Sequence, residues 1–259
     1  MIETNLVGAY HCFELARRDD AQVVFLSTSR VYPYETLDRL GHREGATRFE
    51  LAPGPVEGAS EAGISEEFPL EGPRTFYGAT KLAAELLLTE YAAVHGLATV
   101  IDRCGVISGP WQMGRVDQGV FSYWLLAHLT ARPLSYIGYG GAGKQVRDLL
   151  HVDDLVELVD RQLAAPDHWR GATLNVGGGR QVSLSLAEAT SLCRELTGRT
   201  VPVRSVAEPR PGDVRIYLTD AARLYAMSDW RPRRTAPETL ADTAAWLREH
   251  ENLITSSFG

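Results

Sequence analysis

The sequence has little lysine and little cysteine. Only two lysines, Lys81 and Lys144, occur among its 259 residues, and the other basic side chains are arginines. The three cysteines, Cys12, Cys104 and Cys193, are odd in number and lie far apart. This excludes a disulfide framework and provides no zinc-ligand spacing. Such cysteine usage is typical of a reducing compartment, so we expect a cytoplasmic protein.

Long apolar runs and an excess of positive charge are also absent. No run approaches the about 20 apolar residues that a membrane-spanning helix needs, and the chain does not open with the basic and apolar segments of a signal peptide. The net charge of −7 at pH 7 argues against binding of nucleic acid through a general basic field. We therefore expect neither a membrane nor a nucleic acid as partner.

The composition is that of a globular protein with an ordinary core. Hydrophobic residues make up 44% of the chain and charged residues 23%, and the length suits one large domain or two small ones. Segments with helical periodicity alternate with short apolar runs typical of buried strands. Helices are predicted at the start of the chain and at residues 76–94, 119–130 and 152–165, and strands at residues 23–26, 98–104, 133–138 and 172–176.

This alternation predicts an α/β protein with a largely parallel sheet, in which strand 23–26 is buried on both faces. Two capping boxes, Ser185-x-x-Glu188 and Thr235-x-x-Glu238, predict the beginnings of two further helices. Residues 33–73 are rich in Gly, Pro and Glu and predict a long loop, which in a compact domain is usually functional.

The strongest chemical motif is Tyr77-Gly-Ala-Thr-Lys81. Residues four apart share one face of a helix, so the Lys81 ammonium is expected to favour the phenolate of Tyr77 and to let it act as a base below its normal pKa of about 10. Because arginine serves elsewhere, Lys81 is expected to do chemistry that arginine cannot. The alternative is a surface tyrosine beside a solvated lysine.

A hydroxyl group lies upstream of this pair. The strand at residues 23–26 runs into Ser27-Thr28-Ser29, and ligands of open parallel sheets bind at the carboxyl ends of the strands. A hydroxyl at that position together with a Tyr–Lys pair predicts a proton-transfer site with a group that orients the substrate.

Residues 138–145 match the G-x-G-x-x-G pattern and, except at the end, the phosphate-binding Walker pattern. Gln145 replaces the Ser or Thr that would hold magnesium, and the next residues look extended and do not open a helix. We therefore interpret the segment as a tight glycine loop that presents Arg147. Arg147, Arg210 and Asp213 are candidate contacts for an anionic ligand, because bidentate arginine suits phosphate; solvated arginines are the alternative.

The histidines show no metal-ligand spacing, and no metal site is predicted. His151-Val-Asp153-Asp154 is interpreted as the beginning of a helix, since acidic residues favour a helix N-terminus.

Together these residues resemble the extended short-chain dehydrogenase/reductase family, which comprises NAD-dependent nucleotide-sugar epimerases and dehydratases. The resemblance covers nearly the whole chain. The matching motifs are Asn5-x-x-Gly8, Thr28 three residues before Val31-Tyr32, Tyr77-x-x-x-Lys81, Arg103 before Gly109-Pro110, residues 143–151, and Arg210-Pro-Gly-Asp213.

The resemblance implies a Rossmann-like parallel sheet in residues 1–110 and a smaller, mainly substrate-binding domain in residues 111–259, with a strand at residues 171–177 that returns to the sheet. It implies NAD as cofactor and a nucleotide sugar as substrate. The implied catalytic residues are Thr28, Tyr77 and Lys81, which with Arg103 also bind the cofactor, and the implied substrate-binding residues are Arg147, Arg210, Asp213 and Gln118.

Residues 117–119 and 143–148 resemble one branch of that family most. This branch inverts C2 of a CDP-linked deoxysugar by transient NAD-dependent oxidation. Val106 stands where the family often has Asn, and Pro33 stands where it usually has Gly.

The family's glycine-rich turn for the NAD pyrophosphate is missing at the front. Residues 1–22 contain one glycine, Gly8, so the resemblance implies a chain that starts after the family's first four strands. Strand 23–26 is then expected to have an open edge, which a missing N-terminal segment or a second chain would cover. The resemblance also implies a homodimer through the first helix and the Tyr77 helix.

Two other functions stay open. One is a different enzyme on the same scaffold, such as a nucleotide-sugar 4-epimerase, a dehydratase or a reductase. A Glu or Asp beside Thr28 would favour a dehydratase, but Ser29 and Arg30 stand there. The other is a non-catalytic subunit that binds a nucleotide sugar and has lost NAD.

Overall fold

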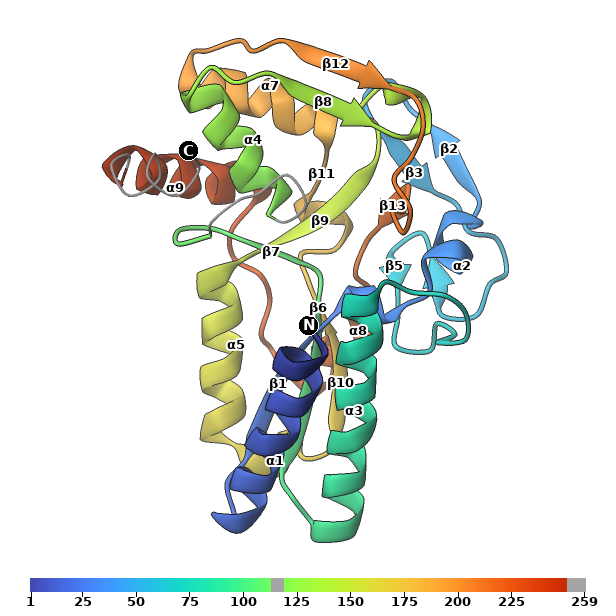
Figure 1. Ribbon diagram of the computed structural model, residues 1–259, viewed down its shortest axis with the longest axis vertical. Helices are drawn as coiled ribbons and strands as arrows, with labels where there is room; N and C mark the ends of the chain where they lie inside the picture. The colour runs from blue at the N-terminus through green and yellow to red at the C-terminus, as the bar shows by residue number, and fades with distance from the viewer. Residues whose placement is uncertain (113–118, 251–259) are drawn as a thin grey trace.

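The computed structural model describes residues 1–112 and 119–250. Its lower part in Figure 1 holds a three-stranded parallel sheet in the order β1-β6-β10. The strands are β1 (Val23–Thr28), β6 (Thr99–Cys104) and β10 (Ala172–Val176). Thr28 pairs with Cys104, and Val176 pairs with the same residue from the other side. The carboxyl ends of all three strands therefore meet at one edge of the sheet.

Helices cover both faces of this sheet. One face is covered by α1 (Gly8–Arg18), which a π-helical turn precedes, and by α3 (Phe76–His95); α5 (Val152–Ala164) covers the other face (Figure 1). Side chains alternate across β6, so Ile101 packs in the cluster of α1 and α3 and Val100 packs in the cluster of α5. This is the layered α/β arrangement predicted from the sequence.

The upper part is built around β9 (Val146–His151). This strand pairs in parallel with β7 (Val106–Ser108) and β13 (Ile216–Tyr217) and antiparallel with β11 (Ser183–Ser185). Beside them lie the parallel pair β8 (Leu134–Ile137) and β12 (Val203–Val206) and the helices α4 (Val120–Leu129), α7 (Leu186–Thr197) and α9 (Ala236–Glu249), which share one apolar core. The short helices α6 (Pro166–Trp169) and α8 (Ala222–Met227) complete the described elements of the C-terminal half.

The segment at residues 33–73 is mostly loop, as predicted, but it also contains short elements that the sequence pattern does not show. The segment contains α2 (Tyr34–Asp38) and two antiparallel pairs, β2 (His42–Glu44) with β3 (Phe49–Leu51) and β4 (Ala59–Ser60) with β5 (Gly63–Ile64). Strands of two or three residues are too short to show periodicity. These short strands are stabilised because apolar side chains of the segment pack into one cluster with residues 214–218.

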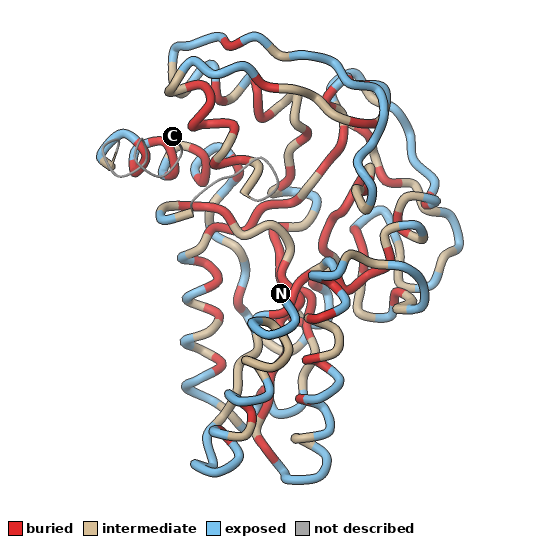
Figure 2. The backbone as a smooth tube through the Cα atoms, viewed as in Figure 1, coloured by how far each residue is buried: buried red, intermediate tan, exposed pale blue. Residues whose placement is uncertain are grey.

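The prediction that strand 23–26 is buried on both faces is wrong. Leu26 is 40% exposed, and residues 23–25 are only partly buried (Figure 2). Within the described residues β1 pairs with β6 alone and forms the edge of the sheet. An apolar run indicates a strand, but the number of neighbours it acquires depends on the rest of the fold.

Local residues define the ends of several helices. Gly96 and Gly198 end α3 and α7 in the left-handed conformation, with φ of 68° and 67°. Both predicted capping boxes form, at Ser185 and at Thr235. In residues 1–112 and 119–250, no helix has the length and apolar character needed to cross a bilayer.

Candidate active site

Thr28, Tyr77 and Lys81 come together at the carboxyl edge of the lower sheet. Thr28 is the last residue of β1, and its hydroxyl accepts a hydrogen bond of 3.2 Å from the Arg30 amide, which caps a 3-10 turn over Ser29–Val31. The Tyr77 side chain lies close to that of Thr28, and this contact favours the Tyr77 phenolate by lowering its pKa. Two residues that are far apart in sequence thus form the pair that the motifs predicted.

Local chemistry fixes where α3 begins and how it docks. Thr75 is the N-cap, and its hydroxyl accepts a hydrogen bond of 3.2 Å from the Gly78 amide. Gly78 faces the 3-10 turn so closely that a Cβ atom there would lie 2.0 Å from the Arg30 carbonyl oxygen. From the other side, the Asn5 amide donates to the Thr80 hydroxyl at 3.2 Å. The first turn of α3 is therefore held against the end of β1.

The electrostatics of Tyr77 differ from the prediction. The Tyr–Lys spacing predicts a lowered phenol pKa, but burial raises the pKa of Tyr77 above its usual value. The contact with Thr28 and the positive charge of Arg30 act in the opposite direction and only reduce this rise. Helical spacing puts Tyr77 and Lys81 on one face but does not account for desolvation by the surrounding chain.

Lys81 lies under the site, with its Nζ atom 4.4 Å from the centre of the Phe25 ring. Desolvation lowers the pKa of Lys81, and the nearby Cys104 and Glu85 partly oppose this. In the described chain no carboxylate lies within 4.0 Å of its ammonium group. Its hydrogen-bond donors are therefore not committed to an acidic side chain.

Arg103, which the family resemblance implies to bind the cofactor, lies in a buried network of polar side chains. It is 7% exposed, and its guanidinium binds Glu85, at 2.8 Å from Nη2 to Oε2, and the Tyr32 hydroxyl at 3.3 Å. Glu85 also accepts a hydrogen bond from Ser27, and Tyr32 donates to Asn175 at 2.8 Å. The structure thus engages Arg103 in a buried network that joins β1, α3, β6 and β10, below the hydroxyl groups of the site.

A pocket begins beside this site and extends to the upper part of the molecule. The turn after Thr28, Thr75 two residues before Tyr77, Arg147 and Gly212 all contribute to its lining, and a Cβ atom on Gly212 would lie 3.0 Å from the Thr75 side chain. The residues that line it are Ser29, Arg30, Tyr32, Tyr34, Leu37, Thr75, Val106, Arg147, Gly212, Val214 and Tyr217.

Of the predicted anion contacts, Arg147 lines this pocket, and Asp213 and Arg210 lie close to Arg147. Arg147 on β9 forms an ion pair with Asp213, at 2.7 Å from Nη2 to Oδ1, and also donates to the Val214 carbonyl at 2.6 Å. Arg210 is exposed at the start of the same loop, and its carbonyl accepts a hydrogen bond from the Asp213 amide. These three predicted residues are therefore close together, whereas Gln118 lies outside the described residues.

Comparison with known protein families identifies the family to which this chain belongs. The model of the NAD dependent epimerase/dehydratase family matches residues 1–177. The chain belongs to this family.

Two curated relatives illustrate the range of names in this family. The CDP-paratose 2-epimerase of Salmonella typhi is 28% identical over 252 residues, which cover 94% of this chain and 70% of the relative. The dTDP-glucose 4,6-dehydratase of Salmonella typhimurium is 26% identical and is covered over 66% of its length, against 95% of this chain. The chain thus spans about two thirds of these relatives.

Solved structures agree on the fold. The UDP-glucose 4-epimerase of Thermus thermophilus, in complex with NAD, superposes with a TM-score of 0.73 at 25% identity. The match covers 96% of this chain and 71% of that structure. The epimerase/dehydratase family and its Rossmann-like fold are thereby shown, and with them the dependence of the family on NAD.

The glycine loop at residues 138–145 does not lead into a helix whose N-terminus could bind a nucleotide phosphate. Strand β9 follows it directly, as predicted. Lys144 reaches back to the first hairpin, where its Nζ atom lies 2.7 Å from Glu44 and 2.9 Å from the Gly45 carbonyl. Lys144 therefore links the glycine loop to the hairpin of β2 and β3.

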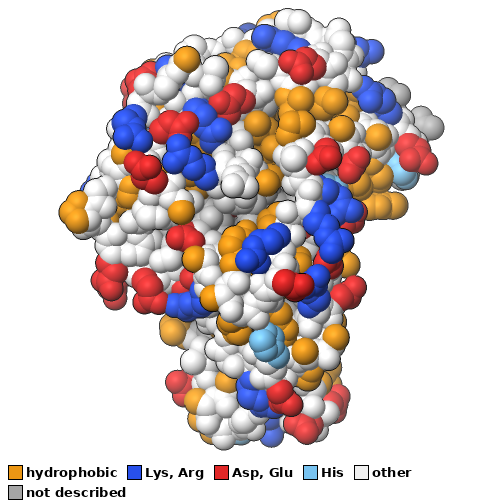
Figure 3. Space-filling view, turned by 180° about the vertical axis from the view of Figure 1, so that it is seen from behind, with side chains coloured by type: hydrophobic (Ala, Val, Ile, Leu, Met, Phe, Trp, Pro, Cys, Tyr) orange, Lys and Arg blue, Asp and Glu red, His pale blue; other side chains and the backbone are white. Residues whose placement is uncertain are grey.

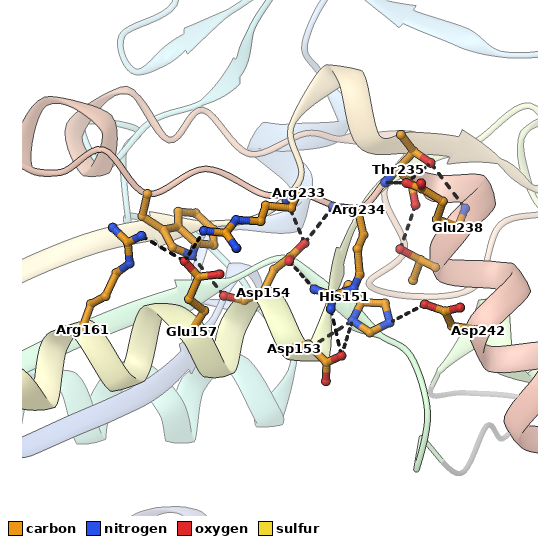
Figure 4. A network of polar contacts seen from close by, with 12 residues as sticks. His151, Asp153, Asp154, Glu157, Arg161, Arg233, Arg234, Thr235, Glu238 and Asp242 are labelled. Carbon is orange, nitrogen blue, oxygen red and sulfur yellow. Dashed lines mark hydrogen bonds and ion pairs between the residues drawn. The ribbon is translucent and has the colours of Figure 1, made fainter.

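His151 begins α5, as predicted, and takes part in a polar network (Figure 4). Its Nδ1 atom accepts a hydrogen bond of 3.1 Å from the Asp153 amide, and its Nε2 atom lies 3.6 Å from Asp242 on α9. Arg234 pairs with the buried Asp154 at 2.6 Å. No group of three or more potential metal ligands occurs in residues 1–112 and 119–250. The network joins α5 to the last helix.

On the rear face of the molecule, acidic and basic side chains lie next to one another (Figure 3).

Sequence reasoning did not assign Arg30, Thr75 or Tyr34 to the site. Arg30 lies two residues after Thr28. This position at the carboxyl end of a strand is a sequence signal from which a role in ligand binding could have been predicted. Tyr34 lies in the segment predicted as loop, where the sequence contains no pattern that places it beside Arg147.

Proposed function

We propose that this protein is a nucleotide-sugar epimerase that inverts C2 of a CDP-linked deoxysugar by transient oxidation. The observation that carries the proposal is the pocket lined by Arg147 and by Ser29, Arg30 and Thr75, which lie close in the chain to Thr28 and Tyr77. We assign the sugar carbon to be oxidised to the side near Thr28 and Tyr77, and the diphosphate to Arg147. The similarity to a protein named CDP-paratose 2-epimerase supports the choice of C2 and of the CDP carrier.

Thr28, Tyr77 and Lys81 suit the nicotinamide and ribose end of NAD. Lys81 is partly desolvated and has no carboxylate partner among the described residues, so its donors suit ribose hydroxyl groups. When bound, NAD would accept a hydride from the sugar carbon and return it. Residues 1–22 contain no glycine-rich turn that would suit the pyrophosphate.

Tyr77 takes the proton of the C2 hydroxyl as C2 is oxidised to a ketone, and it returns a proton to the oxygen when the carbinol re-forms. Thr28 donates a hydrogen bond to the reacting oxygen and keeps it near the phenol. Lys81 contributes positive charge, which favours the phenolate against the desolvation that raises the pKa of Tyr77. Reduction of the opposite face of the ketone inverts the centre.

Arg147 binds the diphosphate, which supplies binding energy away from the reacting carbon. In the structure its Nη2 atom is paired with Asp213, so the incoming phosphate competes with that carboxylate. Arg210 and Asp213 complete the diphosphate and ribose contacts, and the C-terminal part beyond residue 110 is the substrate-binding part.

A 4-epimerase on the same pocket is the second candidate, since the structurally similar Thermus protein is named a UDP-glucose 4-epimerase. A dehydratase is disfavoured, because the lining residues of the pocket include neither Asp nor Glu to serve as an acid for loss of water.

The test is direct observation of the product. The protein is incubated with NAD and, separately, with CDP-paratose, UDP-glucose and dTDP-glucose, and the sugars are followed by proton NMR. The proposal expects a C2 epimer from CDP-paratose. A C4 epimer from UDP-glucose would favour the second candidate, and no conversion of any substrate would contradict both.

A further inference from the structure

The pocket contains two arginines, and only one of them was expected. Arg147 and Arg30 both line it, whereas Arg210 lies outside its lining. Arg30 is exposed, so a ligand in the pocket can reach it.

Arg30 differs from the arginines around it in having no acidic partner. Its Nη1 atom donates to the Gly212 carbonyl at 3.1 Å, and no carboxylate of the described chain lies within 4.0 Å of its guanidinium. In contrast, Arg147 is paired with Asp213 and Arg103 is paired with Glu85.

The two pocket arginines also repel each other. Desolvation lowers the pKa of Arg30 most, and the positive charge of Arg147 lowers it further. The negative charge of Asp213 only partly offsets this decrease. An anion that enters between two guanidinium groups removes this repulsion and gains charge-assisted hydrogen bonds.

The position of Arg30 is fixed relative to the reacting hydroxyl groups. Its amide is bound by Thr28, and its carbonyl packs against Gly78, the residue after Tyr77. This fixes the backbone of Arg30 beside the proton-transfer pair, whereas its guanidinium, which would hold the anion, extends to the Gly212 carbonyl in the pocket that Arg147 also lines.

We propose that Arg30 is a second anion-binding residue of the pocket and that it binds an oxyanion of the nucleotide-sugar substrate. This oxyanion is a diphosphate oxygen, because the CDP-linked deoxysugar of the proposed reaction has no carboxylate. The inference rests on the proposed function, because it assumes that a nucleotide sugar fills the pocket.

The test compares wild type with Arg30→Gln by isothermal titration calorimetry against CDP, UDP, dTDP, UDP-glucose and UDP-glucuronate. Loss of a charged hydrogen bond predicts affinity weakened by about 10- to 100-fold. Weaker binding of the nucleoside diphosphates themselves identifies the diphosphate as the oxyanion. Weaker binding of UDP-glucuronate alone, with UDP-glucose unchanged, would overturn the inference, because Arg30 would then contact a sugar carboxylate and not the diphosphate.

Two further variants separate binding from structure. Arg30→Lys keeps the positive charge, so its affinity is expected to lie between those of Arg30→Gln and wild type. If Arg30 acted only through its contact with Gly212, keeping the charge would not restore affinity. Arg170→Gln removes an arginine that pairs with Asp167 outside the pocket and is expected to bind like wild type. Equal affinity of wild type and Arg30→Gln for all five ligands would overturn the inference. A wild-type protein that binds none of them would overturn the proposed function as well.

Discussion

The two lysines allow the role of a single side chain to be tested. Lys81 lies beneath the Thr28–Tyr77 pair without an acidic partner, whereas Lys144 is tied to Glu44 on the surface. We predict that Lys81→Arg lowers turnover by at least about 100-fold although the charge is kept, because the larger planar group does not fit the same contacts. Lys144→Arg is the matched control and is expected to keep full turnover in the same steady-state assay. Equal rates for the two variants would contradict the role given to Lys81.

At this scale the sequence identified the residue types better than their electrostatics. Tyr77, Thr28, Arg147 and Asp213 are brought together as the motifs predicted. The raised pKa of Tyr77 and the buried Glu85 partner of Arg103 depend on desolvation by segments far away in sequence, which spacing alone does not contain.

At the scale of elements, the contact between α3 and the 3-10 turn is the most sensitive to change. We predict that Gly78→Ala greatly lowers turnover, because its Cβ would meet the Arg30 carbonyl oxygen at 2.0 Å and push the turn away from Tyr77. Gly96→Ala is the control. It strains a left-handed position with no atom within 4 Å of its Cβ, so it is expected to cost about 1 kcal/mol of stability and no activity. Thermal midpoints and rates of both variants check this, and full turnover in Gly78→Ala would contradict it.

The packing of α5 on β6 predicts a pH-dependent stability. Asp102 is fully buried, and desolvation raises its pKa to about 7 despite a hydrogen bond of 3.0 Å from Gln162. A carboxyl whose pKa is higher in the folded state stabilises the fold below its unfolded pKa, and this contribution is lost as the pH rises to about 7. The expected loss is at most a few kcal/mol, at about 1.4 kcal/mol per pKa unit.

The measurement is the urea midpoint at pH 5 and at pH 8. Wild type is expected to be less stable at pH 8, and Asp102→Asn is expected to lose much of this difference, since an amide stays neutral and can donate to the Gln162 oxygen that has no partner. Asp160→Asn, on the exposed face of α5, should behave like wild type. An undiminished difference in Asp102→Asn would show that ionisation of Asp102 is not its source.

Helices and long strands were predictable because their periodicity and caps are local. The capping boxes at Ser185 and Thr235 and the left-handed Gly96 illustrate this. The hairpins within residues 33–73 were not, because their short strands are held by apolar contacts with the 214–218 segment.

At the scale of the whole molecule, the exposed apolar side chains of α1 and α3 bear on assembly. Leu15 on α1 and Leu86 and Val94 on α3 are 55%, 63% and 68% exposed. We predict a homodimer through these helices, with a mass by light scattering of twice 28.5 kDa. Leu86→Glu is expected to give the monomer, whereas Leu163→Glu on the exposed side of α5 should leave the mass unchanged. A wild-type mass of 28.5 kDa would contradict this assembly.

The proposed reaction depends on Thr28 and Tyr77 and on the neighbouring pocket that Arg147 lines. The measurement that tests it most directly is the rate of epimer formation from CDP-paratose by wild type and by Tyr77→Phe, with NAD present. Tyr77→Phe keeps the ring but removes the group that accepts the proton, so we predict formation of the epimer by wild type and a rate at least about 100-fold lower in the variant. An unchanged rate in Tyr77→Phe would contradict the central claim.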